Sequence, residues 1–129
     1  MESLYYVVSW LCHRTCQHCY DDRFRPYHGS DLERQIAAAE CNAPRILANL
    51  PARLTYRDWN DDLREKPGRI ILAGGEILLA PVRERVLYPA LAQLRTRYED
   101  QAKIVIQTTG DTLQPAIVSE LLERGVWMI

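Results

Sequence analysis

Short apolar runs alternate along the chain with longer segments in which apolar residues recur every three or four positions. The short runs are rich in β-branched and aromatic residues, which predicts strands at 4–10, 69–73, 103–107 and 126–129. The helical period between them predicts helices at about 32–50, 82–98 and 113–122. Strands that are apolar along most of their length and alternate with helices are typical of a parallel sheet covered by helices, so an α/β fold is expected.

Individual residues predict where these helices begin, bend and end. Ser30 followed by Glu33 matches a capping box and predicts the start of the first helix. Pro44 lies inside that helical pattern and is expected to kink or split it, and Pro89 is expected to make the second helix irregular. Gly125 is placed as a C′ glycine that stops the third helix.

Composition restricts the class of protein without naming a function. The chain has 129 residues, 47% of them hydrophobic and 26% charged, with a net charge of −1, as expected for one globular domain. No basic surface for nucleic acid and no membrane span are expected, and the first residues lack the pattern of a secretory signal. The charged stretch 52–68 predicts a surface excursion with one short helix near 59–64.

Three of the four cysteines lie close together, in the pattern Cys12-x₃-Cys16-x₂-Cys19 after the first predicted strand. Three thiolates hold three corners of an iron–sulfur cluster and leave one iron open, because such clusters normally take four cysteines. Cys41 falls in the first helical pattern and is expected to be a small buried residue. The cysteine spacing does not resemble a disulfide framework, and thiolate ligands suit a reducing cytoplasm.

Two other interpretations of the cysteines stay open. A Cys₃His zinc site would use His28 as its fourth ligand. A non-catalytic iron–sulfur or zinc module would carry electrons or bind a partner instead of transforming a substrate.

Three strands end in segments suited to ligand binding. These segments are the cysteine loop, Gly74-Gly75-Glu76 and Gln107-Thr108-Thr109-Gly110. Ligands of parallel α/β proteins bind at the carboxyl edge of the strands, so the three segments are expected to converge. The simpler interpretation makes the glycines a tight turn and bonds the threonine hydroxyls to backbone.

This order of motifs resembles the radical S-adenosylmethionine enzymes, and the resemblance runs along essentially the whole chain. It implies a parallel-stranded partial (β/α) barrel of TIM type, with about the first three βα units and a fourth strand present. Residues 1–129 would then be an incomplete N-terminal portion of the family's core domain. The resemblance implies that Cys12, Cys16 and Cys19 hold a [4Fe–4S] cluster. S-adenosylmethionine would bind its open iron and be cleaved to a 5′-deoxyadenosyl radical that abstracts hydrogen from a substrate.

The resemblance also assigns cofactor-binding residues. His18 and Tyr20 stand where the family's loop meets adenine, and Gly74, Gly75 and Glu76 stand where backbone groups meet the methionine ammonium. The same resemblance places the last two such residues, Gln107 and Thr109, in the cofactor cavity, with Thr108 beside them. The family's glycine motif usually continues with proline, whereas this chain has Ile77. The substrate implied is a small molecule, a peptide or a tetrapyrrole, and the reductant is a flavodoxin or ferredoxin.

Overall fold

The computed structural model describes residues 1–60 and 64–129, and these form an α/β protein with a mostly parallel sheet. Along the chain the elements are β1 (Ser3–Val7), α1 (Gly29–Ala48), β2 (Thr55–Arg57), β3 (Glu65–Ala73), α2 (Ala80–Val82), the π-helical turn η1 (Arg83–Leu87), α3 (Tyr88–Tyr98), β4 (Ala102–Ile106), α4 (Pro115–Glu123) and β5 (Val126–Met128). The α/β class and the four strands expected from the sequence are confirmed. The sheet is open within the described residues and does not close into a barrel.

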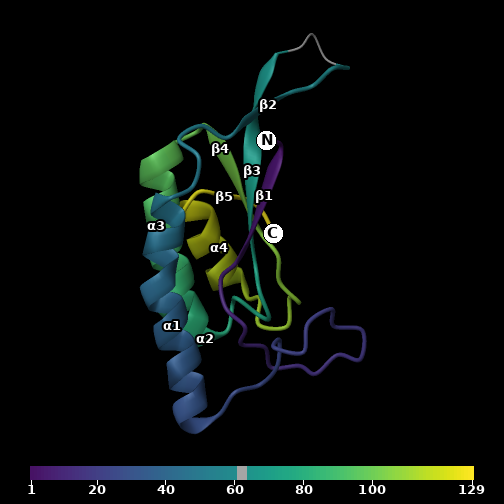
Figure 1. Ribbon diagram of the computed structural model, residues 1–129, viewed down its shortest axis with the longest axis vertical. Helices are drawn as coiled ribbons and strands as arrows, with labels where there is room; N and C mark the ends of the chain where they lie inside the picture. Colours follow the sequence, from purple (N-terminus) through teal and green to yellow (C-terminus); the bar gives the residue numbers. More distant parts are fainter. Residues whose placement is uncertain (61–63) are drawn as a thin grey trace.

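The parallel part of the sheet has the strand order β1-β3-β4-β5 (Figure 1). One row of paired residues crosses it, from Tyr5 to Ile71, Val105 and Met128. Figure 1 shows the helices gathered on one side of the sheet, as repeated right-handed crossovers require. The opposite face of the sheet carries no helix among the described residues, and the cysteine loop lies at its carboxyl end (Figure 1).

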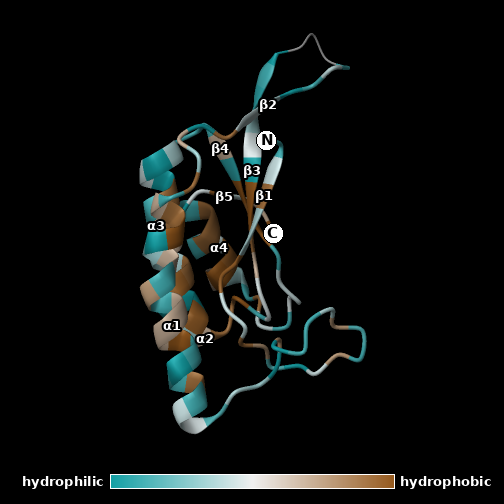
Figure 2. Cartoon of the chain, viewed as in Figure 1, coloured by the Kyte–Doolittle hydropathy of each residue, from teal (hydrophilic) through white to brown (hydrophobic). Residues whose placement is uncertain are grey.

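Alternation along the strands creates the core between the sheet and the helices. Alternate strand residues such as Ile70, Leu72 and Ile106 are buried against the helix layer, where Leu47 and Leu91 are fully buried. Figure 2 shows the same partition, with hydrophobic residues along the inner faces of the helices and hydrophilic residues on their outer faces. None of the helices in the described part of the chain is long and apolar enough to cross a membrane.

α1 differs from its sequence prediction in two respects, the residue at which it begins and the effect of Pro44. α1 begins at Gly29 with His28 at the N-cap and no side-chain cap, so the capping box of Ser30 is wrong. Pro44 does not split the helix, which continues to Ala48. The carbonyl that Pro44 leaves without a helical donor belongs to Glu40, an exposed residue.

Cys41 is exposed on α1, so its prediction as a buried residue is wrong. The buried face of α1 is set by Ile36, Ala43 and Leu47. Five positions beyond Ile36, a side chain lies roughly 140° around the helix, which turns Cys41 toward solvent.

The other two helix signals are confirmed. η1 ends at Leu87, two positions before Pro89, and this irregularity fits a proline, because a residue without an N–H cannot bond the carbonyl of Arg85 in α-helical fashion. Gly125 has φ +84° and its N–H donates to the carbonyl of Leu122 at 2.9 Å, which ends α4 as predicted.

A two-stranded arm projects from the end of the sheet where the parallel strands begin (Figure 1). β2 pairs antiparallel with the first half of β3, and Thr55 faces Pro67. β3 therefore begins at Glu65 instead of residue 69, and the excursion expected over 52–68 contains a strand that the sequence did not predict. The short helix expected near 59–64 falls largely on residues 61–63, which lie outside the described residues.

Candidate functional site

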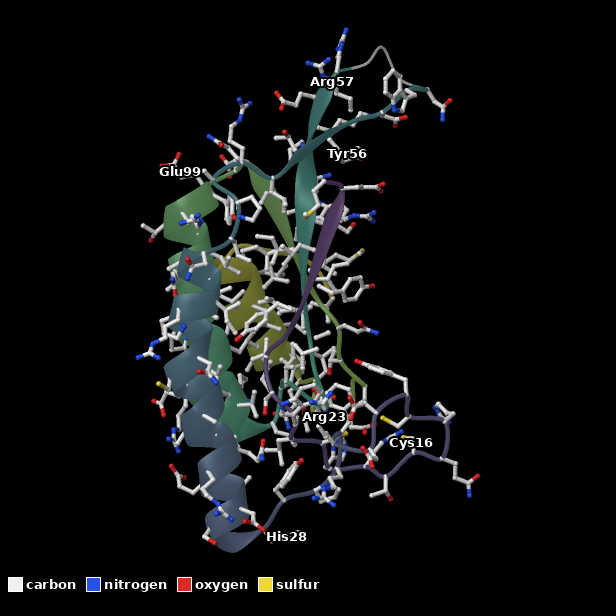
Figure 3. All side chains as sticks on the ribbon, viewed as in Figure 1. Cys16, Arg23, His28, Tyr56, Arg57 and Glu99 are labelled. Carbon is white, nitrogen blue, oxygen red and sulfur yellow. The ribbon has the colours of Figure 1, made fainter. Side chains whose placement is uncertain are left out.

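The cysteine loop leaves the carboxyl end of β1 and returns beside it. The N–H of Cys12 donates to the carbonyl of Arg25 at 3.1 Å, and Leu11 forms a parallel bridge with Arg25. Between these ends the loop turns tightly where the N–H of Cys19 donates to the carbonyl of Cys16 at 3.1 Å. Cys12 is buried, whereas Cys16 and Cys19 are exposed. Figure 3 shows Cys16 on the outer part of the loop.

The three thiols share one loop but are not gathered around a common centre. Within residues 1–60 and 64–129, no three His, Cys, Asp or Glu side chains are arranged to hold a metal ion. The thiol of Cys19 donates to the carbonyl of Asp21 at 3.3 Å, and His28 lies apart from Cys16, at the start of α1 (Figure 3). Cysteine thiolates are the usual ligands of iron–sulfur clusters, so the donor types of this loop suit such a group, although one thiol is buried and two are exposed.

Asp111 fastens the cysteine loop to the segment that follows β4. Its carboxylate bonds Nε2 of His13 and accepts a hydrogen bond from the guanidinium of Arg14, each at 2.6 Å. The bond from His13, with help from Thr109 and Arg14, lowers the pKa of Asp111. The loop is thus tied to the end of a second strand by residues that directly follow Cys12.

Aromatic contacts support the other half of the loop. The guanidinium of Arg23 lies 3.8 Å from the ring centre of Trp10 and pairs with Asp21 at 2.5 Å. Hydrogen bonds from Arg23 lower the pKa of Asp21 to about 2. The ring of Phe24 is buried, and its centre lies 4.9 Å from that of Trp10 and 5.2 Å from that of Tyr20. Tyr20 itself is exposed.

Gly74 and Gly75 give the cysteine loop room to pass the end of β3. A Cβ on Gly74 would lie 2.6 Å from the carbonyl oxygen of Ser9. A Cβ on Gly75 would overlap the carbonyl of Leu11 and lie 2.7 Å from Cβ of Cys12. The two glycines therefore allow the backbone at the end of β3 to lie close against the start of the cysteine loop.

Glu76 is completely buried, and its carboxylate joins the ends of β3 and β4. It accepts hydrogen bonds from the N–H of Leu78 at 2.9 Å and of Thr109 at 2.8 Å. The hydroxyls of Thr108 and Thr109 donate to the same carboxylate at 2.7 and 2.5 Å. Burial raises the pKa of Glu76, but these hydrogen bonds outweigh it, and the pKa lies below its usual range. The hydroxyls of Thr108 and Thr109 also accept hydrogen bonds from the backbone N–H groups of Gly110 and Asp111, at 3.1 and 3.4 Å, so the backbone bonding of the simpler interpretation is present beside the bonds to Glu76.

A hollow of about 530 Å³ opens at the carboxyl ends of the strands, on the face without helices. It is lined by five of the residues assigned from the sequence, namely Tyr20, Gly74, Gly75, Gln107 and Thr109. Its remaining lining residues are Tyr5, Val7, Ala73 and Thr108. The structure does not bring His18 or the three cysteines into this lining, and Glu76 lies behind it, turned into the protein.

Comparison with known proteins shows no matching family model, no similar curated protein and no similar solved structure.

The sequence analysis missed three contributors to this site. Asp111 holds the loop, Tyr5 forms one side of the hollow, and Arg23 stacks on Trp10. The position of Asp111, directly after a predicted carboxyl strand end, was a usable signal. Tyr5 was already in a predicted strand, but alternation alone does not say which face of a sheet stays open.

Proposed function

We propose that the chain is a radical S-adenosylmethionine enzyme, or the N-terminal part of one, built on a partial (β/α) barrel. The observation that carries the proposal is the hollow at the carboxyl strand ends, because Tyr20, Gly74, Gly75, Gln107 and Thr109 line it together. These residues come from three separate strand ends, and the hollow lies beside a loop with three free thiols.

Cys12, Cys16 and Cys19 would hold a [4Fe–4S] cluster, leaving one iron free for S-adenosylmethionine. When bound, this pair supplies one-electron cleavage of the sulfonium and hydrogen abstraction from the substrate. The exposure of Cys16 and Cys19 leaves their side chains free to turn toward the buried thiol of Cys12.

The chain's own residues would position the cofactor. Tyr20 offers an exposed aromatic ring for adenine, while the amide of Gln107 and the hydroxyl of Thr109 offer polar groups inside the hollow. Backbone groups at Gly74 and Gly75 would meet the methionine ammonium. The carboxylate of Glu76 is already satisfied by its own donors, which supports a role in bracing this turn rather than in direct contact with the ammonium.

His18, which lies outside the hollow, would approach adenine only if the outer loop folds inward. The substrate class stays as proposed from the resemblance, a small molecule, a peptide or a tetrapyrrole. Electrons would come from a flavodoxin or ferredoxin, and free thiolate ligands favour a cytoplasmic location.

Anaerobic reconstitution tests the proposal. We expect one [4Fe–4S] cluster per chain, lost in Cys12→Ala, Cys16→Ala and Cys19→Ala but kept in the control Cys41→Ala, whose thiol is exposed on α1. S-adenosylmethionine should change the electron paramagnetic resonance spectrum of the reduced cluster. Stoichiometric zinc without iron uptake would instead support the Cys₃His zinc interpretation. An intact cluster whose spectrum ignores S-adenosylmethionine would reject the enzyme proposal.

A further inference from the structure

Two of the three loop thiols differ from the third in their access to solvent. Cys16 and Cys19 are exposed, whereas Cys12 is only 7% exposed and lies where the loop leaves β1. Oxidation of a cysteine requires contact between its sulfur and the oxidant, so exposure decides which thiols react. A dissolved oxidant therefore reaches Cys16 and Cys19 before it reaches Cys12.

A single turn of the backbone brings the two exposed cysteines together. The N–H of Cys19 donates to the carbonyl of Cys16 at 3.1 Å, which closes a turn with one cysteine at each end. Such a turn holds the Cα atoms of its first and last residues within about 7 Å. A disulfide joins cysteines whose Cα atoms lie about 4.4–6.8 Å apart, so the turn provides the spacing that a bond between these thiols needs. The same Cys-x-x-Cys spacing is typical of redox-active thiol pairs.

The segments on both sides of this turn are attached to the rest of the protein. Before the turn, the guanidinium of Arg14 donates to Asp111 at 2.6 Å. After it, the guanidinium of Arg23 lies 3.8 Å from the ring centre of Trp10. A bond between the two exposed thiols therefore requires rotation of their side chains and no displacement of either attached segment.

The other two cysteines are not placed for the same reaction. The N–H of Cys12 donates to the carbonyl of Arg25, and a Cβ added to Gly75 would lie 2.7 Å from Cβ of Cys12. The side chain of Cys12 is therefore packed against the end of β3. Cys41 is exposed, but it lies in α1, a regular helix that contains no second cysteine. The geometry thus favours one pair among the four cysteines.

We propose that Cys16 and Cys19 form a reversible disulfide when a small dissolved disulfide, such as oxidised glutathione, oxidises the loop. One loop thiolate attacks the dissolved disulfide, breaks its S–S bond and releases one small thiol. The other loop cysteine attacks the resulting mixed disulfide, forms the S–S bond within the loop and releases the second small thiol. The loop loses two S–H bonds, and two electrons and two protons pass to the small disulfide.

The disulfide stands on the geometry of the loop, whereas its consequence for a cluster rests on the proposed function. Cys16 and Cys19 would supply two of the three thiolates that hold the cluster. Only the thiolate is a metal ligand, so the oxidised loop would bind no cluster until a thiol reductant restored both side chains. Exposed disulfides are reduced more easily than structural ones, which makes this block reversible.

Thiol mapping tests the pairing. The full chain, freed of metal by a chelator, is incubated with oxidised glutathione, alkylated in denaturant and digested with trypsin. Cleavage after Arg14 and Arg23 releases peptide 15–23, which contains Cys16 and Cys19 and no other cysteine. We expect this peptide to resist alkylation and to be lighter than its reduced form by two hydrogen atoms. Dithiothreitol should restore both thiols.

Three results of this mapping would overturn the proposal. They are alkylation of both cysteines of peptide 15–23, attachment of a separate glutathione to each of them, and a disulfide from this peptide to Cys12 or Cys41.

Serine substitutions test whether the two thiols act together. Cys16→Ser and Cys19→Ser each leave one thiol in peptide 15–23, which should then carry one glutathione and no internal disulfide. Cys41→Ala is the matched control, because it removes an exposed thiol outside the loop, and it should form the internal disulfide at the parent rate. Circular dichroism confirms that each variant is folded. Glutathione that persists on the parent peptide as it does on the serine variants would show that the second thiol cannot reach it, and would reject the disulfide.

Cobalt binding separates this inference from the proposed function. Co²⁺ binds thiolates without reducing disulfides, and its thiolate absorbance is measured in Cys41→Ala so that only loop thiols respond. The oxidised loop should bind at least about tenfold less Co²⁺ than the reduced loop, because two thiolates are missing. Equal binding in both forms would overturn the proposed block. Absence of binding even in the reduced loop would count against the proposed function, while the mapped disulfide would stand.

Discussion

Glu76 shows how a single side chain can join two strand ends. Its carboxylate takes no part in a salt bridge with a basic residue among the described contacts, yet hydrogen bonds keep its pKa low. The donors Thr108 and Thr109 lie more than thirty residues further along the chain, at the end of the neighbouring strand. The residue therefore fixes the spacing of β3 and β4 where the hollow begins.

Replacing Glu76 by Gln should destabilise the fold by about 2 kcal/mol at neutral pH, because charge-assisted hydrogen bonds are lost and an amide N–H₂ meets other donors. Since the folded-state pKa is lowered, the carboxylate stabilises the protein fully above its unfolded pKa of about 4.3. This stabilisation is lost as pH falls through the lower folded-state pKa. Urea unfolding of both proteins should therefore show a difference in free energy that shrinks toward pH 3.

Glu123→Gln is the control for this measurement, because Glu123 is exposed on α4. It should change the free energy of unfolding by no more than about 0.5 kcal/mol at any pH. A loss in Glu76→Gln that is equally large at pH 3 and pH 7 would contradict the assignment of a low pKa to this carboxylate.

Gly75→Ala should displace the cysteine loop, because the new Cβ would overlap the carbonyl of Leu11 and crowd Cys12. We expect iron content after reconstitution and folding stability to fall together, the latter by about 2 kcal/mol or more. Gly110→Ala is the comparison, since no atom lies within 4 Å of its added Cβ. It should cost about 1–2 kcal/mol of backbone strain, because φ is +81°, and leave iron content unchanged. Normal iron content in Gly75→Ala would refute the steric account.

At the scale of elements, the cysteine loop is held from two sides. His13 and Arg14 reach Asp111 after β4, and Cys12 bonds back to the segment before α1. The loop has no regular structure of its own beyond one bridge, so these attachments determine where its thiols lie.

Asp111→Asn should loosen the loop without unfolding the protein, because exposed ion pairs contribute only about 0–1 kcal/mol each. Labelling of the buried thiol of Cys12 by a maleimide should become several times faster, and high salt should have the same effect on the parent protein. Asp100→Asn, at an exposed turn before β4, should leave the labelling rate unchanged. A labelling rate that stays constant in Asp111→Asn would show that the contacts of Asp111 with His13 and Arg14 do not restrain Cys12.

The strands that periodicity could predict were those with continuous apolar runs, because each is buried by helices on at least one face. β2 escaped prediction because Thr-Tyr-Arg is short, polar and stabilised by pairing with β3 alone. The start of α1 was misplaced since no side chain caps it, and local sequence could not show that His28 would stand at that end. The glycine pair was located correctly, but its close neighbour, the cysteine loop, became visible only in three dimensions.

For the whole molecule, residue patterns predicted a parallel α/β sheet, and only the family resemblance implied that a barrel would be partial. Closure depends on how strand edges meet, and residue patterns describe faces better than edges. The open face carries Tyr5 and Trp127, whose apolar character would suit either an interior or an interface.

The pairing of β1 with β3 also bears on how the chain is made. The N–H of Val8 bonds the carbonyl of Ala73, so the first strand waits for its neighbour until Ala73 has been synthesised. At roughly 5–20 residues per second, that wait is about 3–13 s. Throughout it, Cys12, Cys16 and Cys19 sit on a segment without its supporting strand, and their thiols are open to oxidation. Under the proposed function, the newborn chain would need reducing surroundings for these seconds, before a cluster could protect its cysteines.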